Sequence, residues 1–358
     1  MGHGRSFSKL SRRSLMAAGG VVVASPFFWR QADAQTKRII VRNSGGPYSK
    51  GYEEGFYRPF REATGIEVVG VTSSYEPTAQ IKSMVEAKNY TWNIASISGA
   101  AVDQLSSEGD YLERHGLEKE GAVAQVPREY VSAYGVGSDV YATALGYRKE
   151  KFEGGKAPDS WKDFWDTSAF PGRRAMRRHP FDTIEQALFA DGVPSDKVYP
   201  LDFDRAFKSL DRIKPHVTTW WTGGAQATQL LVSGEVDMIA TYSSRVQAAA
   251  DAGAPVGVSW DQSLWGYNSW TILKGAPNLE ICCEFIKFCS DPKRLAVITN
   301  YVSVGPVTPE SYKYIDPKKA PTLPTFPENR ARSVKINDAF WAKSKDKAIE
   351  RFTAWLLK

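Results

Sequence analysis

The sequence is poor in cysteine, histidine and methionine: its 358 residues include three cysteines, four histidines and five methionines. It contains no Cys-x-x-Cys, His-Glu-x-x-His, Gly-x-Ser-x-Gly or Gly-x-x-x-x-Gly-Lys motif. These absences remove sequence support for a metalloprotease, a serine hydrolase and a phosphate-binding loop. His115, His179 and His216 lie far apart in the sequence, without metal-ligand spacing. We therefore expect no catalytic residue, no metal site and no cofactor, and an exported enzyme is a minor alternative.

The three cysteines fall in one short stretch, residues 281–289. Ile281, Phe285 and Phe288 lie on one stripe of a predicted helix there. Cys282 and Cys289 would stand two turns apart, about 10 Å along the axis, which is too far for a disulfide within one straight helix. Although an oxidising compartment favours pairing, we expect buried thiols that act as small apolar side chains.

Long apolar runs are also missing. The apolar stretch near the N-terminus, residues 17–28, has roughly 12 residues, whereas about 20 are needed to cross a bilayer. It follows the twin arginines Arg12 and Arg13 and precedes Ala32-Asp33-Ala34, a small-x-small cleavage pattern. This order is typical of an export signal, and the arginine pair indicates the Tat route. Residues 1–34 are therefore predicted to be a Tat signal peptide, with the mature protein in the periplasm.

The charge is close to balanced once this segment is removed. The net charge of +6 falls to about +2, because five basic residues and one acidic residue leave with residues 1–34. We find no basic stripe interleaved with aromatics, so we expect no nucleic-acid partner. One dense basic cluster, Arg173, Arg174, Arg177 and Arg178, is interpreted as a solvated edge, with an anion-contacting or docking surface as the alternative.

The chain alternates strand-like and helix-like segments. Strands are predicted at 38–41, 66–71 and 92–97, with helices between them, and again at 236–241 after a helix containing Leu230. This alternation predicts an α/β fold with parallel strands. The length exceeds what one core usually supports. Two extended segments, residues 141–147 and 267–273, are interpreted as crossovers between two lobes, and residues 348–357 as an amphipathic helix.

Short segments spread over the chain resemble the bacterial periplasmic solute-binding proteins of ABC importers, above all the spermidine/putrescine-binding type. They are Gly45–Tyr48, Tyr57–Ile66, Trp92–Ser96, Gly234–Met238 and Val304–Pro309. The resemblance implies a type II-like periplasmic binding protein: two α/β lobes, a hinge, and a ligand cleft between the lobes. Lobe 1 would comprise residues 35–145 and about 269–305, and lobe 2 residues 146–268 and about 306–358. It also implies a monomer that delivers its ligand to an inner-membrane permease, or feeds a sensor.

The expected ligand-binding residues follow strand ends or stand at the second crossover, where open α/β sheets bind ligands. They are Tyr48, Ser96, Ser98, Trp220, Tyr242, Arg245, Trp265, Tyr267 and Asn268. Aromatic faces hold alkyl chains and ammonium groups. For each aromatic residue, core packing is the alternative.

Two of these residues bear on the ligand class. The polyamine-binding proteins that this chain resembles carry an acidic residue where Asn268 stands, and Asn offers only a neutral amide. The fork of Arg245 suits a carboxylate, and it would repel a diamine unless an acid such as Asp139, Asp182 or Glu185 neutralised it. The main interpretation is a small organic amine such as putrescine or spermidine. The alternative is a zwitterion such as γ-aminobutyrate.

Overall fold

The computed structural model describes Met1, residues 37–73 and residues 76–358, and Thr36–Lys358 forms one compact unit. The predicted signal peptide lies outside the described residues apart from Met1. Within the described part of the chain, no helix combines the length and the apolar character needed to cross a bilayer.

In the described residues the strands form one mixed sheet in the order β2-β1-β3-β8-β4-β7-β5-β6, with β9 (Val334–Lys335) beside β8. β1 (Arg38–Asn43) runs parallel to β2 (Glu67–Thr72) and β3 (Ile94–Ser98). β5 (Arg174–Arg177) runs parallel to β6 (Val217–Trp221) and β7 (Met238–Tyr242). Between these two parallel sets stand the long antiparallel strands β4 (Val136–Arg148) and β8 (Val256–Ile272). The predicted α/β class is confirmed, and both crossover segments are strands, longer than predicted.

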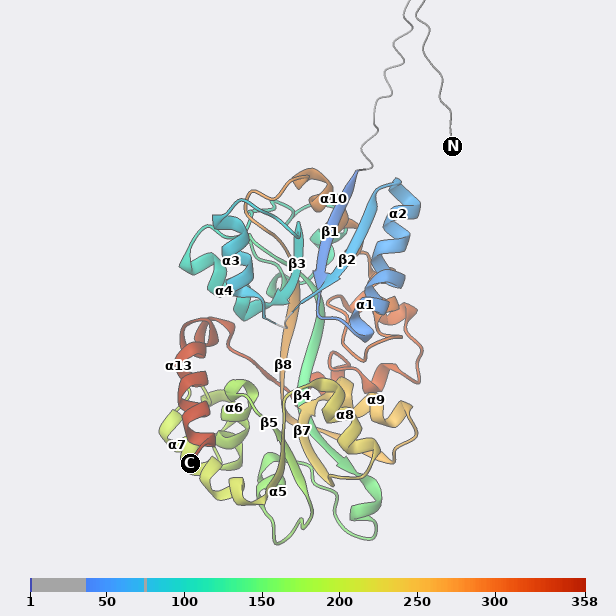
Figure 1. Cartoon of the computed structure of the whole chain (residues 1–358). Coiled ribbons are helices and arrows are strands. Elements are labelled where there is room, and N and C mark those ends of the chain that lie inside the picture. The colour runs from blue at the N-terminus through green and yellow to red at the C-terminus, as the bar shows by residue number, and fades with distance from the viewer. Residues whose placement is uncertain (2–36, 74–75) are drawn as a thin grey trace, which may run out of the picture. The chain divides into compact units, whose positions relative to one another are not determined.

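At the end of the sheet formed by β1–β3, helices cover the strands (Figure 1). α1 (Pro47–Tyr52) continues through a π-helical turn, Glu53–Tyr57, into α2 (Arg58–Thr64). Tyr52, Phe56 and Phe60 recur every four residues and are fully buried, as an amphipathic helix requires. Gly65 ends the helix with a left-handed φ of 72°, a conformation that costs glycine little. The other helices at this end are α3 (Thr78–Glu86), α4 (Gly99–Glu108), α10 (Leu279–Cys289) and α11 (Pro292–Ile298).

Around β5–β7 lies a second group of helices (Figure 1). They are α5 (Trp161–Trp165), α6 (Pro180–Ala190), α7 (Phe203–Ile213), α8 (Gly224–Val232), α9 (Ser243–Asp251) and α13 (Asp338–Leu356). The predicted C-terminal helix is the last part of α13. The remaining helical segments are α12 (Pro327–Ala331) and short 3₁₀ turns at Gly121–Gln125, Arg128–Tyr130, Lys149–Phe152, Ser195–Lys197, Lys214–His216, Pro309–Tyr314 and Ala320–Thr322.

The core is rich in aromatic side chains. Trp270 of β8 packs against Tyr52, Phe56 and Phe285, with ring centroids 4.7–5.7 Å apart. Full burial of each such side chain contributes about 1.5–3 kcal/mol. The three cysteines are free thiols on α10, as expected; Cys282 and Cys289 are buried, whereas Cys283 is half-buried.

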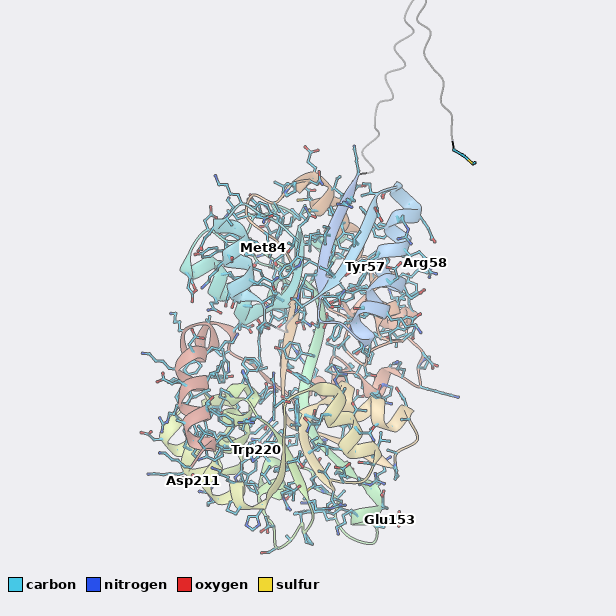
Figure 2. All side chains as sticks on the ribbon, in the orientation of Figure 1. Tyr57, Arg58, Met84, Glu153, Asp211 and Trp220 are labelled. Carbon is cyan, nitrogen blue, oxygen red and sulfur yellow. The ribbon has the colours of Figure 1, made fainter. Side chains whose placement is uncertain are left out.

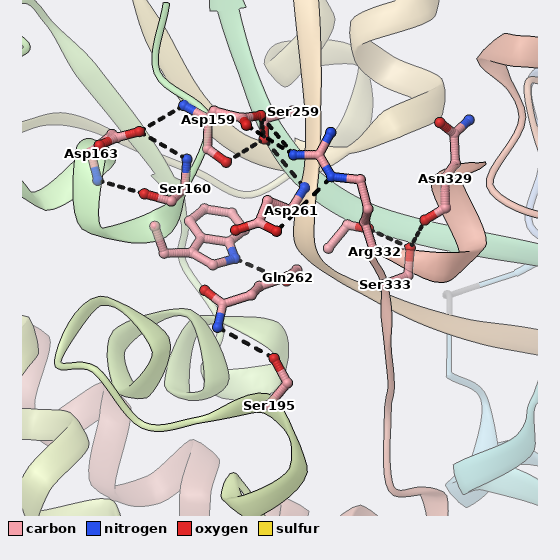
Figure 3. Close-up of polar contacts among 12 residues, drawn as sticks. Asp159, Ser160, Asp163, Ser195, Ser259, Asp261, Gln262, Asn329, Arg332 and Ser333 are labelled. Carbon is pink, nitrogen blue, oxygen red and sulfur yellow. Dashed lines mark hydrogen bonds and ion pairs between the residues drawn. The ribbon is translucent and has the colours of Figure 1, made fainter.

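The chain that leads from α12 to α13 is tied to the start of β8 (Figure 3). Arg332 donates to the carboxylate of Asp159 at 2.9 Å and lies 4.0 Å from Asp261. The indole of Trp161 on α5 donates to the carbonyl of Gln262 at 3.0 Å. These bonds join α5, β8 and the segment before α13 on the side of the sheet remote from β1.

Candidate functional site

A cavity of about 260 Å³, called cavity A here, collects residues that follow strands of both parallel sets. Its lining residues are Ser44, Gly45, Tyr48, Tyr141, Arg177, Trp221, Thr222, Gly223, Gly224, Tyr242, Ser244 and Arg245. β1, β5, β6 and β7 all end at this cavity, with Tyr141 of β4 between them. The carboxyl ends of strands in open α/β sheets are the usual place for a ligand.

A second cavity of about 220 Å³, cavity B, adjoins the first, because Tyr141 and Arg177 line both. Its other lining residues are Glu76, Ser98, Ala100, Ala101, Gln104, His179, Phe181, Trp341, Ala342 and Lys345. The two cavities form one cleft between the β1–β3 end and the β5–β7 end of the sheet.

Cavity A is electropositive. Arg177 and Arg245 line it, and no acidic residue is among the described residues that do. The Nε atom of Arg245 is buried and has no hydrogen-bond partner within the described part of the chain. Arg177 lies over the rings of Trp221 and Tyr242 and bonds Asp182 at 3.3 Å. Since a buried donor without an acceptor is costly, Arg245 is suited to an anionic ligand group.

Two helices begin at the same cavity. α8 starts at Gly224 and α9 at Ser243, and neither N-terminus has a side-chain hydrogen bond as a cap. The first amides of a helix point outward, and the helix dipole favours negative charge there. Together with Arg245, these two N-termini make a site for a carboxylate or a similar anion.

Aromatic rings form the remaining walls of cavity A. The rings of Tyr141 and Tyr242 meet edge to face at 6.0 Å, and those of Trp221 and Tyr242 at 6.4 Å. Trp221 is held by a bond from its Nε1 to the carbonyl of Ala240 at 3.0 Å. Such walls suit the methylene groups of a short alkyl chain.

Beneath Tyr48 lies the buried carboxylate of Asp139. One of its oxygens accepts from the Tyr48 hydroxyl at 3.2 Å and from the Asn268 amide at 2.9 Å. The other accepts from the Tyr52 hydroxyl at 3.1 Å and from Ser138 at 2.9 Å. Burial raises the pKa of the Asp139 carboxyl, and the four hydrogen bonds oppose that shift.

Of the residues predicted from the sequence, the structure brings Tyr48, Tyr242 and Arg245 together in cavity A. Ser98 lines cavity B and caps α4 by accepting from the amide of Ala101 at 3.2 Å. Ser96 and Asn268 are buried and line neither cavity. Ser96 shares a hydrogen bond with the hydroxyl of Tyr52, and the amide of Asn268 donates to Asp139.

Trp220 does not line the cavity; its neighbour Trp221 does. Trp220 packs against Phe352 and Trp355 of α13 at 6.1 and 5.7 Å, in the lower half of the view in Figure 2. Successive side chains of a strand point to opposite faces, so only one of two adjacent tryptophans reaches the cavity. The sequence pattern does not reveal which.

Trp265 and Tyr267 also lie away from both cavities. Trp265 pairs with Ala142 and lies under the guanidinium of Arg330, and Tyr267 pairs with Val140 and packs on Tyr130 at 5.3 Å. Directly paired residues share a face of the sheet, and neighbours along a strand alternate. Tyr141 faces the cavity, so Trp265 and Tyr267 lie on the opposite face.

Sequence reasoning missed Tyr141 and Arg177 as lining residues, and of the two adjacent tryptophans it selected Trp220 where Trp221 lines the cavity. Arg177 belongs to the basic cluster interpreted as a solvated edge, and that interpretation is wrong for two of its members. Arg174 is buried and donates to the carbonyls of Phe164 and Gly172, and Arg177 lines the cleft. The position of Arg177 at the end of a short strand was the signal that could have found it.

A sheet of this order with a cleft at the ends of its strands defines a solute-binding protein of the periplasmic type. An ABC transporter substrate-binding protein from Bradyrhizobium japonicum is 36% identical, with a TM-score of 0.84 over 89% of this chain and 99% of that one. The Atu4243 GABA receptor is 31% identical, with a TM-score of 0.81 over 89% and 98%. The gamma-aminobutyric acid-binding protein of Pseudomonas aeruginosa is 32% identical over 92% of this chain and 93% of that protein.

Residues 56–325 match the family of bacterial extracellular solute-binding proteins. The chain therefore belongs to this family, and it is the substrate-binding component of an ABC transporter. Its relatives bind small molecules.

Proposed function

We propose that this protein captures a zwitterionic, amino-acid-like solute of the γ-aminobutyrate kind in the periplasm and delivers it to an inner-membrane permease. The observation that carries the proposal is the buried, unpartnered Nε of Arg245 in a cavity lined by two arginines and, within the described residues, by no acid. A diamine such as putrescine would place a second cation beside these arginines. A carboxylate would pair with them.

The solute carboxylate fits between Arg245 and the first amides of α8 and α9. It accepts a charge-assisted bond from the guanidinium and supplies the cap that both helices lack. The methylenes of the solute lie against Tyr141, Trp221 and Tyr242. Two relatives named for GABA, at 31% and 32% identity, support the same solute class here.

Calorimetry with γ-aminobutyrate, putrescine and spermidine tests the solute class. Wild-type protein should bind γ-aminobutyrate and not the diamine or the polyamine. Arg245→Ala should weaken binding by about 2–5 kcal/mol, because it removes a charge-assisted hydrogen bond to the carboxylate in a closed cleft. Arg58→Ala is the matched control, since Arg58 lies on the exposed face of α2. Tight binding of putrescine that survives Arg245→Ala would reinstate the polyamine interpretation.

The proposal includes two lobes that close on the solute by bending at a hinge. Lobe 1 comprises residues 35–145 and about 269–305, lobe 2 comprises residues 146–268 and about 306–358, and β4 and β8 carry the hinge. The protein acts as a monomer after Tat export and removal of residues 1–34. Small-angle scattering should show a smaller radius of gyration with saturating solute; an unchanged radius would argue against closure.

A further inference from the structure

The position of Asp139 bears on where the cleft would hold the amine end of the solute. Ser138 and Asp139 of β4 and Asn268 of β8 form a buried polar cluster. Tyr48 connects this cluster to cavity A, because it lines the cavity and its hydroxyl donates to Asp139 at 3.2 Å. The cluster sits on the β1–β3 side of the cavity, whereas Arg245 and the N-termini of α8 and α9 come from the β5–β7 side.

The direction of the Tyr48 hydrogen bond follows from Asp139. Four donors surround the carboxyl of Asp139, and their hydrogen bonds favour its ionised form, which has no proton to give. Tyr48 and Asn268 donate to one oxygen, and Tyr52 and Ser138 donate to the other. A phenol has one proton and two lone pairs, and the proton of Tyr48 is directed at Asp139. Toward a ligand, the Tyr48 oxygen therefore acts as an acceptor.

We infer that the Tyr48 oxygen, polarised by Asp139, is the ammonium subsite of the cleft, so that the amine end of the solute faces β1 and the carboxylate end faces Arg245. This inference rests on the proposed function. An ammonium group is a donor without lone pairs, and it matches an acceptor backed by a buried negative charge. A carboxylate at the same place would meet this acceptor and the negative charge behind it and be rejected, which gives the solute one orientation.

Asp139 does not line either cavity, so it acts through Tyr48 as a positioning residue. Asn268 has a part in the same arrangement, because its amide donates to the oxygen that Tyr48 also uses. An amide at position 268 supplies this proton, which an ionised carboxylate there would not.

The test compares γ-aminobutyrate with butyrate, which keeps the carboxylate and lacks the ammonium. Calorimetry gives the ratio of the two affinities for each variant. Tyr48→Phe removes the acceptor and should lower γ-aminobutyrate affinity about tenfold or more, the scale of a hydrogen bond to a charged group, with butyrate affinity unchanged. Asp139→Asn lets an amide donate to Tyr48 and should lower the ratio in the same direction.

Tyr90→Phe is the matched control. It also removes a tyrosine hydroxyl that donates a hydrogen bond, here to the carbonyl of Lys274 at 2.7 Å, but Tyr90 lines neither cavity, so the ratio should stay at the wild-type value. If Asp139→Asn does not fold, Tyr48→Phe alone decides. Equal losses for γ-aminobutyrate and butyrate, or an unchanged ratio in Tyr48→Phe, overturn the ammonium subsite and leave the proposed function standing. Failure of wild-type protein to bind any carboxylate overturns both.

Discussion

The guanidinium of Arg245 occupies the space that a side chain at Gly224 would need: its Nε lies 2.5 Å, and its Cζ 2.7 Å, from the position of a Cβ built on Gly224. The first residue of α8 is therefore without a side chain where the arginine crosses the helix start. This close approach keeps the charge of Arg245 beside the first amides of the helix, where an anion gains from both.

Gly224→Ala should displace the guanidinium and weaken the binding of carboxylate solutes. We expect a loss of about 1–3 kcal/mol in binding free energy, the scale of one charge-assisted hydrogen bond. The melting temperature should change little, because alanine is a better helix former than glycine. Gly155→Ala is the control, since a Cβ there meets only the Phe152 carbonyl at 3.9 Å. Unchanged affinity in Gly224→Ala would mean that Arg245 takes no part in binding.

Trp220→Ala should destabilise the protein without weakening solute binding. Trp220 packs against Phe352 and Trp355 on α13, so removing it should cost about 2 kcal/mol or more of unfolding free energy. Tyr242→Ala should do the reverse and lower affinity by about 1–3 kcal/mol through lost contact area in cavity A. Urea unfolding and calorimetry on both variants check this. A large affinity loss in Trp220→Ala would place that ring in the site after all.

Asn268→Asp should destabilise the protein and give no gain in diamine binding. The Asn268 amide stands 2.9 Å from the Asp139 carboxylate. Two carboxylates at such a short distance cannot both be ionised. We expect a loss of about 2–4 kcal/mol at pH 8, partly recovered at pH 5, where one proton can be shared. Urea unfolding at the two pH values measures it. A stable variant with new affinity for putrescine would contradict the assignment of Asn268 to the Asp139 cluster.

We expect Glu185 to lower the stability of the protein as pH rises toward neutrality. Burial raises the pKa of its carboxyl from 4.5 to about 7, so the folded state holds a proton that the unfolded chain releases near pH 4.5. The associated stability is full below pH 4.5 and is lost as pH rises through about 7. Glu185→Gln keeps an acceptor for Tyr199 and Trp341 and should flatten this dependence.

Unfolding free energies at pH 4.5, 6 and 7.5 compare the two proteins. Some slope should remain in Glu185→Gln, because burial also raises the pKa of Asp182 to about 6 and that of Asp338 to about 7. Identical slopes for wild type and variant would show that Glu185 does not titrate in this range.

Much of the fold can be predicted from the sequence, because its signals are local. The four-residue spacing of Tyr52, Phe56 and Phe60, with Gly65 after it, specifies a helix and its end. Short β-branched runs between helices specify an α/β fold, and the strand ends predict where Tyr48, Tyr242 and Arg245 come together. These features depend on residues close together in the chain, so periodicity and turn chemistry are enough to find them.

The arrangement of the residues around the cleft depends on strand pairing and on long-range contacts, which the order of residues in the chain does not reveal. Which of Trp220 and Trp221 faces the cavity, and which face of β8 carries Trp265, is set by strand register, and a one-residue shift reverses every side chain. Asp139 and Asn268 lie 129 residues apart in the sequence and share a hydrogen bond. Only the tertiary structure brings such groups within reach, because hydrogen bonds and burial act over a few ångströms regardless of sequence separation.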